Sequence, residues 1–354
     1  HNVAYIISEE WENKVTEAGA LYIPYDNYPI EPKKHHINRL QFRHCVETTL
    51  RVGYEYDCIV FDADFYAGAK IAHKLGKKYI RIYYDIAYNT ATIKKFRRYL
   101  PFFKRLSLTK PFSYFFALGE AGRYKRELNI SDIVNELTLS TISDLNISFV
   151  SKTFQPENTS FPEKNYVFTG PSMENSKVSC IIPFSAMNDA IIFISVGCKT
   201  DSKFLNYCYE AFKNARISVI IAFENGANAN IIGPIPDNFY VYPAMLPKEV
   251  LKRTDLFITD GSSTKINQAL FYGIPVIVYC NSRTDYYLAK RVEQLNLGKK
   301  LTKKDLSLGR LRQIVIDLLK NDTILDNIII TEAETKLMGG TLKAADAIES
   351  YIAK

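Results

Sequence analysis

Short apolar runs rich in Val, Ile, Phe and Tyr alternate along this chain with segments that have the apolar spacing of helices. The runs predicted to be strands are Val3–Ile7, Cys58–Phe61, Tyr79–Tyr84, Ile191–Val196, Ile217–Phe223, Asn238–Val241, Leu256–Thr259 and Pro275–Tyr279. The segments predicted to be helices are Trp11–Ala18, Ala67–Leu75, Lys203–Ala215, Lys248–Arg253 and Lys265–Tyr272. Strands that alternate with helices form βαβ units, whose strands pair in parallel. The pattern therefore predicts an α/β fold built on parallel sheets.

The alternation occurs twice, on either side of the stretch 169–189, which is rich in Pro, Ser and Asn. Such a composition is typical of a linker, and 354 residues suit two domains of about 150 residues each. We predict a Rossmann-like domain over 1–169, a linker over 170–188, a second Rossmann-like domain over 189–337 and a C-terminal helix over 338–354. Ligands of parallel sheets bind outside the carboxyl ends of the strands. We therefore expect the site in a cleft between the two domains.

Charge and cysteine content disfavour several classes of protein. The 45 Lys and Arg exceed the 38 Asp and Glu by 7, which is too mild an excess to indicate a nucleic-acid partner. The six cysteines form no CxxC pair, so we expect neither a zinc site nor a disulfide framework, and we expect a reducing, cytoplasmic location. No apolar run reaches the ~18 residues of a transmembrane helix. The chain opens on a strand without an initiator Met or a signal peptide, so we expect residue 1 to be an interior point of a longer or trimmed product.

Basic and aromatic residues are interleaved between Ala91 and Glu127, and Pro101 interrupts any single helix there. Three interpretations are open. The segment is an amphipathic surface element whose aromatic rings pack inward, an apolar acceptor pocket or partner surface, or a membrane-surface element.

Several ordered segments resemble one known family. They are Phe149–Pro156 followed by Tyr166–Ser172, then Ile192–Gly197, then Leu256–Gly261 continuing through Ala269–Val276 and Ala289–Val292. Together they resemble the family 1 glycosyltransferases, most closely the bacterial macrolide-glycosyltransferase type. The resemblance runs nearly from end to end of the chain.

The resemblance implies a GT-B fold, in which two Rossmann-like domains face each other across a cleft. It implies that the C-terminal domain holds a nucleotide sugar as co-substrate and the N-terminal domain a small apolar acceptor with a hydroxyl. A histidine would remove the acceptor proton, because a hydroxyl is a poor nucleophile until a base does so, and an aspartate would orient that histidine. The sugar would transfer with inversion, with no metal and no other cofactor.

On the acceptor side, Asp62 matches the orienting aspartate, at a strand end before a helix. The alternative is that Asp62 is an N-cap or turn residue. The family's histidine would align before residue 1, and the chain has histidines only at positions 1, 35, 36, 44 and 73. Aromatic side chains are expected to line the acceptor pocket, namely Tyr84, Tyr88, Phe96 and Phe103.

On the donor side, the contact positions depart from the family pattern while the frame around them is kept. Asp260 stands where the family has histidine, Lys265 where it has a phosphate-binding serine, and Gln268 where it has a ribose-binding glutamate. An alternative for Asp260 is the N-cap of the following helix, worth about 1 kcal/mol. The candidate donor-binding residues are Ser195, Gly197, Asp260, Gly261, Ser262, Ser263, Thr264, Lys265, Gln268, Thr284 and Asp285.

Two functions therefore stay open. The first is a pseudo-glycosyltransferase that keeps the fold and has lost donor contacts. It would stabilise a partner, such as an active glycosyltransferase or a second copy of this chain, or hold a small apolar ligand in the N-terminal domain. The second is an active inverting glycosyltransferase with an altered donor, in which Lys265 holds the diphosphate and Asp285 the sugar hydroxyls.

Overall fold

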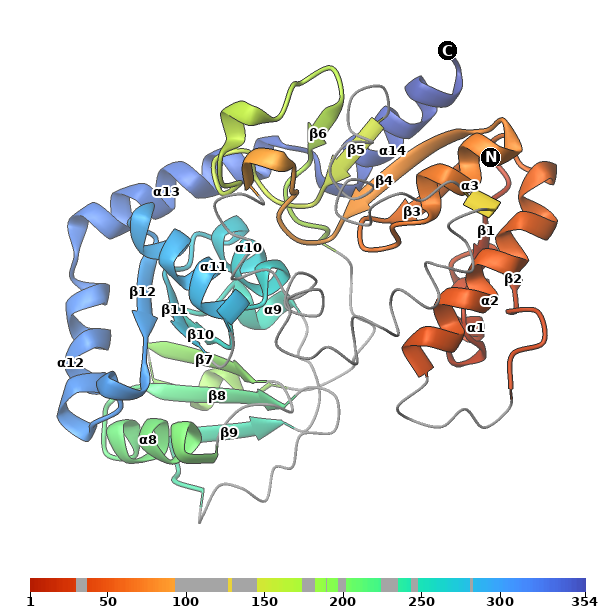
Figure 1. Ribbon diagram of the computed structural model, residues 1–354. Coiled ribbons are helices and arrows are strands. Elements are labelled where there is room, and N and C mark those ends of the chain that lie inside the picture. Colours follow the sequence, from red (N-terminus) through yellow and green to blue (C-terminus); the bar gives the residue numbers. More distant parts are fainter. Residues whose placement is uncertain are drawn as a thin grey trace.

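The computed structural model has two lobes, each built on a parallel sheet (Figure 1). The structure describes residues 1–29, 37–92, 127–128, 145–173, 182–188, 190–196, 202–223, 235–242, 248–280 and 283–354. The segment from Ala91 to Glu127, which carries the interleaved basic and aromatic residues, lies outside the described residues except at its ends.

The second lobe contains a six-stranded parallel sheet with the strand order β12-β11-β10-β7-β8-β9. Its strands are β7 (Ile191–Val196), β8 (Ser218–Phe223), β9 (Phe239–Tyr242), β10 (Leu256–Thr259), β11 (Val276–Tyr279) and β12 (Gly298–Leu301). Its helices are α8 (Ser202–Phe212), α9 (Lys248–Leu251), α10 (Ser263–Phe271), α11 (Arg283–Gln294), α12 (Leu308–Leu319) and α13 (Asp322–Leu337).

Helices cover both faces of this sheet, which explains why its strands read as continuous apolar runs. Side chains alternate between the faces of a strand. Thus Ile192 and Ile194 of β7 pack with α8 and α12, while Phe193 packs with α10 and α11.

The first lobe contains a four-stranded parallel sheet with the order β3-β4-β5-β6 and a separate pair, β1-β2. The strands are β1 (Ala4–Ile6), β2 (Leu21–Ile23), β3 (Cys58–Asp62), β4 (Lys78–Tyr83), β5 (Leu145–Ser148) and β6 (Tyr166–Phe168). The helices are α1 (Glu12–Glu17), α2 (Ile37–Val52) and α3 (Gly68–Leu75). The predicted strands and helices of both lobes match these bounds to within a few residues, which confirms the predicted parallel α/β class.

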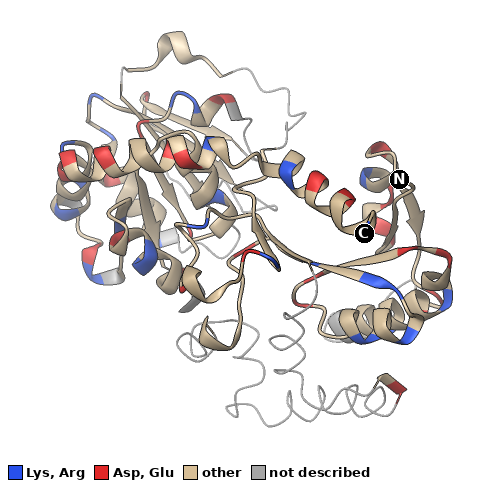
Figure 2. Ribbon diagram, turned by 90° about the horizontal axis from the view of Figure 1, so that it is seen from above, with Lys and Arg blue, Asp and Glu red and all other residues tan. Residues whose placement is uncertain are grey.

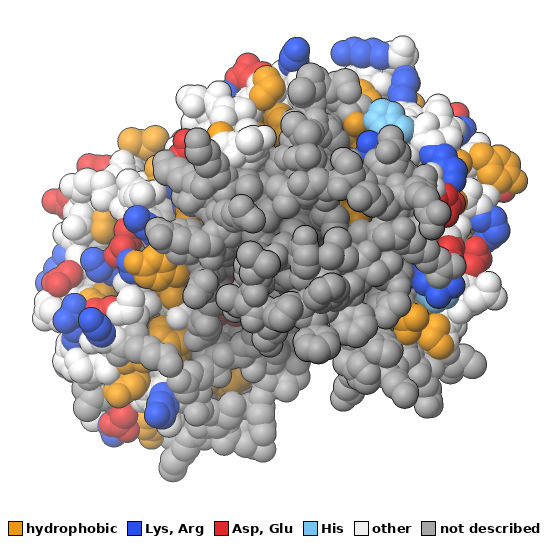
Figure 3. Space-filling view, in the orientation of Figure 1, with side chains coloured by type: hydrophobic (Ala, Val, Ile, Leu, Met, Phe, Trp, Pro, Cys, Tyr) orange, Lys and Arg blue, Asp and Glu red, His pale blue; other side chains and the backbone are white. Residues whose placement is uncertain are grey.

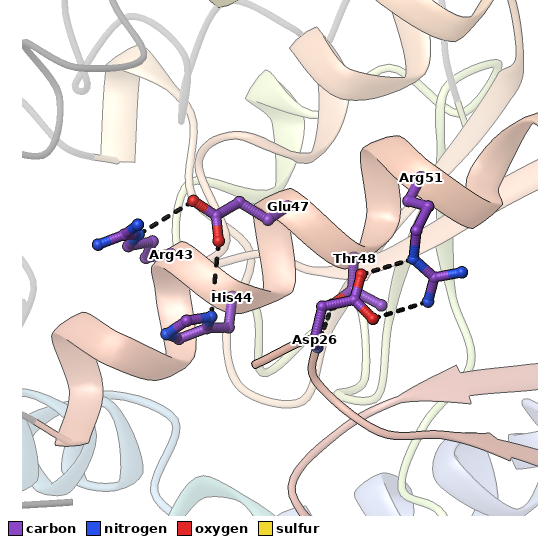
Figure 4. A network of polar contacts seen from close by, with 6 residues as sticks. All are labelled: Asp26, Arg43, His44, Glu47, Thr48 and Arg51. Carbon is purple, nitrogen blue, oxygen red and sulfur yellow. Dashed lines mark hydrogen bonds and ion pairs between the residues drawn. The ribbon is translucent and has the colours of Figure 1, made fainter. Parts of the chain in front are cut away.

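Polar contacts tie the loop after β2 to α2 (Figure 4). Arg51 donates two hydrogen bonds to the Asp26 carboxylate, at 2.6 and 2.8 Å, and the Asp26 backbone N–H donates to the Thr48 hydroxyl at 2.8 Å. These bonds lower the pKa of Asp26, with the Arg51 hydrogen bond as the largest cause. The β1-β2 pair is thereby anchored to a helix that also packs against α3.

The last helix, α14 (Gly340–Ile352), returns to the first lobe. The chain runs along α13 from the second lobe and then places α14 beside β4 and β5 (Figure 1). There Ala344 is buried against Ile80, Leu145 and Ile147. The final helix therefore completes the core of the lobe in which the chain begins, whereas the predicted domain boundaries stay a prediction.

Charged residues of both signs are interspersed along the described parts of both lobes (Figure 2). In the orientation of Figure 1, exposed hydrophobic side chains lie in small groups between charged ones (Figure 3). None of the helices in the described ranges combines the length and the apolarity that a bilayer crossing requires.

We expect Ala344→Asp to lower the free energy of unfolding by about 2–4 kcal/mol, because it buries an unpaired carboxylate between α14 and the first sheet. The exposed neighbour Ala345 provides the matched control, since Ala345→Asp should stay within about 0.5 kcal/mol of the parent. Urea unfolding of both variants measures this, and equal effects would contradict the observed packing of α14.

Candidate functional site

The two sheets meet through a shared apolar core. Ile86 and Phe154 of the first lobe belong to the same buried cluster as Ile266 of α10 and Leu288 of α11. Ile86 and Phe154 lie in the segments after β4 and β5, and α10 and α11 follow β10 and β11, so the cluster brings the carboxyl ends of the two sheets together. This is the region in which ligands of parallel sheets bind.

Asp62 is the last residue of β3, and its side chain is exposed. Its Oδ1 accepts a hydrogen bond from the Asp64 backbone N–H at 2.8 Å, whereas the N-cap position of α3 is Ala67. Asp62 therefore lies in the turn after β3 and does not cap α3, which begins six residues later at Gly68. Its role as an orienting aspartate stays a prediction. Desolvation raises the pKa of Asp62, and the charge of Asp64 adds to that rise.

The described histidines lie away from this aspartate. His44 is buried in α2, where Nδ1 lies 3.5 Å from Glu47 and the ring edge contacts Tyr28. His73 is exposed on α3 and contacts Tyr79. Among the residues that the structure describes, no histidine hydrogen-bonds or ion-pairs with Asp62.

Two of the four predicted acceptor-side aromatics fall within the described chain. Tyr84 is exposed and stacks on Phe149, with ring centroids 6.0 Å apart. Tyr88 is half-buried and its hydroxyl donates a hydrogen bond to Asp64. Phe96 and Phe103 lie outside the described residues. The structure thus places Tyr88 beside the aspartates that follow β3.

The candidate donor turn, residues 260–262 and the first turn of the helix that follows, connects β10 to α10. Lys265 lies in the first turns of α10, and its Nζ forms an ion pair with Asp260 Oδ1 at 3.2 Å. Both side chains are mostly shielded from solvent, with 13% and 24% exposed. The N-cap of α10 is Ser262, which makes no side-chain capping bond. The alternative that Asp260 caps this helix is therefore wrong, because the turn at Gly261 delays the helix start.

Glycine is needed at position 261 because of the backbone angle there and because Asp285 lies close by. Its φ is +96°, and a Cβ placed on it would lie 2.6 Å from the Cβ of Asp285. The first turn of α11 therefore packs directly on the donor turn. Ser195 is buried at the end of β7, in register with Thr259 of β10.

The remaining predicted donor residues differ in their surroundings. Ser263 is buried, Thr264 is exposed, and the Gln268 amide lies 3.5 Å from the Ser172 carbonyl oxygen. Gly197 lies outside the described residues, and so does the side chain of Thr284, which is a position within α11. The structure brings together Asp260, Gly261, Ser262, Ser263, Lys265 and Asp285.

Asp85 was not among the predicted site residues, although it lies at the centre of the junction. Desolvation raises the pKa of Asp85, and the charges of Asp64 and Asp285 add to that rise, whereas hydrogen bonds from the Ile86 backbone N–H and the Ser263 side chain oppose it. The Asp85 residue is exposed to solvent. One signal was available in the sequence, because Asp85 follows a predicted strand just as Asp62 does.

No role was predicted for Arg291, although it lies in one of the segments that resemble the family, and it joins the two lobes. Its guanidinium donates hydrogen bonds to the carbonyl oxygens of Thr153, Phe154 and Gln155, at 2.6, 3.1 and 3.4 Å. Across the described ranges, no group of three or more His, Cys, Asp and Glu side chains has metal-binding geometry.

Known proteins resemble the chain both in sequence and in structure. It is 31% identical over 208 residues to the uncharacterized UDP-glucosyltransferase YojK of Bacillus subtilis, a match that covers 58% of the chain and 51% of that relative. It is 28% identical over 305 residues to the NDP-glycosyltransferase YjiC of Bacillus licheniformis, covering 84% and 72%. The crystal structure of the calicheamicin glycosyltransferase CalG4 superposes with a TM-score of 0.78 at 20% identity, covering 100% and 91%.

The chain is a homologue of bacterial glycosyltransferases and has the GT-B fold. The expected family resemblance and fold are thereby confirmed. No model of a known protein family matches the chain. The match to YojK spans about half the length of that relative, and the likeness to CalG4 is one of fold.

We expect Gly261→Ala to cost about 1–3 kcal/mol of stability more than Gly19→Ala. Gly19 has a similar φ of +78° but open space around it, so it carries the backbone strain without the clash against Asp285. Thermal unfolding of both variants measures the difference. Equal losses would mean that α11 does not pack against the donor turn.

We expect Asp85→Asn to raise stability at pH 7, because the raised pKa of Asp85 means that the folded state disfavours its charged form. Below the unfolded pKa of about 3.9 the parent is protonated in both states, so the gain should vanish as pH falls toward 4. Urea unfolding between pH 4 and pH 7 measures this, with exposed Asp346→Asn as the control. A gain that does not change with pH would contradict the expectation.

Proposed function

We propose that this GT-B glycosyltransferase homologue is a pseudo-glycosyltransferase, whose nucleotide-sugar site has lost affinity for its ligand and which stabilises an active glycosyltransferase. The observation that carries the proposal is the ion pair between Lys265 and Asp260. A diphosphate is bound by helix amides and by cations. In this turn the cation already has a carboxylate partner within its own loop.

Electrostatic magnitudes favour this interpretation. A carboxylate about 4 Å from a phosphate charge costs on the order of 4 kcal/mol at an effective dielectric near 20. Asp260 therefore both occupies Lys265 and repels an anionic donor. The named NDP-glycosyltransferase relatives act on a class of ligand that carries the diphosphate which this turn would disfavour.

Isothermal titration of the protein with UDP and with UDP-glucose tests the proposal. We expect the Kd of both ligands to be millimolar or weaker. A micromolar Kd for either ligand would contradict the proposal that the donor site is lost. Asp260→Asn frees Lys265 and should tighten UDP binding by about tenfold or more. Asp237→Asn, an equal charge change at an exposed position of the same lobe, should leave binding unchanged.

The partner half of the proposal has its own test. Size-exclusion chromatography of the protein mixed with an active glycosyltransferase from the same cell should give a joint peak, and the melting temperature of that enzyme should rise. If the protein elutes as a homo-oligomer in the absence of the enzyme, the partner is a second copy of this chain. A cytoplasmic location belongs to the same proposal and is checked by cell fractionation.

A second candidate, an active inverting glycosyltransferase with an altered donor, is favoured by one observation. Asp62 is exposed at the carboxyl end of β3, with a raised pKa, beside Asp64 and Tyr88. That position suits an aspartate that orients a base. A screen of nucleotide sugars against apolar hydroxyl acceptors distinguishes the two candidates, since turnover with any pair would displace the pseudoenzyme proposal.

A further inference from the structure

We propose that helix α13 is the surface through which two copies of this chain associate, packed antiparallel across a two-fold axis. The surface lies on the solvent side of the helix, and we call it the α13 stripe. Its members are Asp322, Asp326, Ile329, Ile330, Ala333, Lys336 and Leu337. The inference rests on the proposed function only in its partner half, for which it names the contact surface, and it does not depend on the donor turn.

Helix α13 is apolar on two opposite faces. It runs along the outside of the second lobe toward the first (Figure 1), and its inner face buries Ile328 in the core that both lobes share. On the outer face, Ile329 and Ile330 are 61% and 65% exposed, and Leu337 is 88% exposed. The solvent face of a surface helix is normally polar. Single exposed apolar side chains are common, but a group of them on one face marks an interaction site.

The exposed apolar residues are spaced so that they form one ridge. Residues four apart are neighbours on a helix surface, and Ile329, Ala333 and Leu337 follow one another at that spacing, with Ile330 beside them. Ridges of this kind interlock when two helices pack. The smallest side chain, Ala333, lies in the middle, with larger ones on both sides. Two antiparallel copies that cross at Ala333 therefore place Ile329 of each copy opposite Leu337 of the other.

The charges of the stripe favour the antiparallel arrangement. Asp322 and Asp326 lie toward its amino end and Lys336 toward its carboxyl end, all exposed. The Lys336 ammonium pairs with Glu332 of its own helix, but its side chain is still half exposed, and an ammonium has three donors. Antiparallel copies bring the acidic end of each stripe toward the basic end of the other, whereas parallel copies would oppose like charges.

The size and composition of the stripe fit a reversible contact with a second copy. An exposed apolar patch of this kind is on the order of a few hundred Å², while a standard interface buries about 800 Å² on each partner. We therefore expect a Kd in the micromolar range. A membrane surface is a poorer occupant, because helices that lie on membranes carry mostly Lys and Arg on their polar face, whereas this stripe begins with two aspartates.

Sedimentation velocity across the micromolar range tests the inference on the full chain. The parent should show a reversible monomer–dimer equilibrium. Ile329→Asp places a charge within the contact and should raise the dimer Kd at least about tenfold. Ile235→Asp makes the same change at a position of the same lobe that is 56% exposed, and it should leave the Kd unchanged. Circular dichroism confirms folding of each variant.

A second variant tests the two-fold axis directly. A cysteine near a two-fold axis faces its own copy, so Ala333→Cys should give a disulfide-linked dimer on a non-reducing gel after mild oxidation. Ala345→Cys, at an exposed position of α14, and the parent should stay largely unlinked over the same time.

A parent that stays monomeric throughout would overturn the inference, and so would a dimer whose Kd is the same for Ile329→Asp as for the parent. In a monomeric parent, a joint peak with an active glycosyltransferase that Ile329→Asp abolishes would overturn it as well, because the stripe would then bind a different protein. Absence of linkage by Ala333→Cys in a dimeric protein would exclude the antiparallel arrangement about Ala333. Tight UDP binding by the parent would instead contradict only the loss of the donor site.

Discussion

The shared apolar core between the two lobes is the constraint on which the rest of this structure depends. Ile86 and Phe154 are buried together with Ile266 and Leu288, so the carboxyl ends of two parallel sheets are pressed against each other. Apolar burial is non-directional and would tolerate sliding. The hydrogen bonds from Arg291 to three carbonyl oxygens give the junction one geometry.

That geometry gathers negative charge at the place where the glycosyltransferase homologues are expected to bind an anionic donor. Asp64, Asp85 and Asp285 interact electrostatically with one another, and Lys265 is engaged by Asp260. The fold is that of a GT-B protein, while the local charges would oppose the anionic donor that the proposed function concerns. This contrast between the conserved fold and the altered contact positions is what the proposed function explains.

Much of the fold could be predicted from the sequence, because a buried parallel strand and its crossover helix are local patterns. The strands β7 and β10 and the helix α3 lie within a residue of their predicted bounds. Neither β5 nor β6 was predicted as a strand, since short apolar runs such as Leu145–Ser148 do not separate strand from helix by periodicity. The docking of α14 on the first sheet was not predicted, because it depends on contacts about 200 residues or more apart in the chain.

The candidate site, like the fold, could be predicted from the sequence only in part. The sequence by itself determined where the candidate donor turn lies and how Asp260 and Lys265 depart from the family pattern. Only the tertiary structure decided that Lys265 pairs with Asp260, that Asp285 packs on Gly261 and that Asp85 faces Ser263. The physical reason is that residue type is a local property, whereas the partner of a charge depends on how two separately folded sheets are brought together.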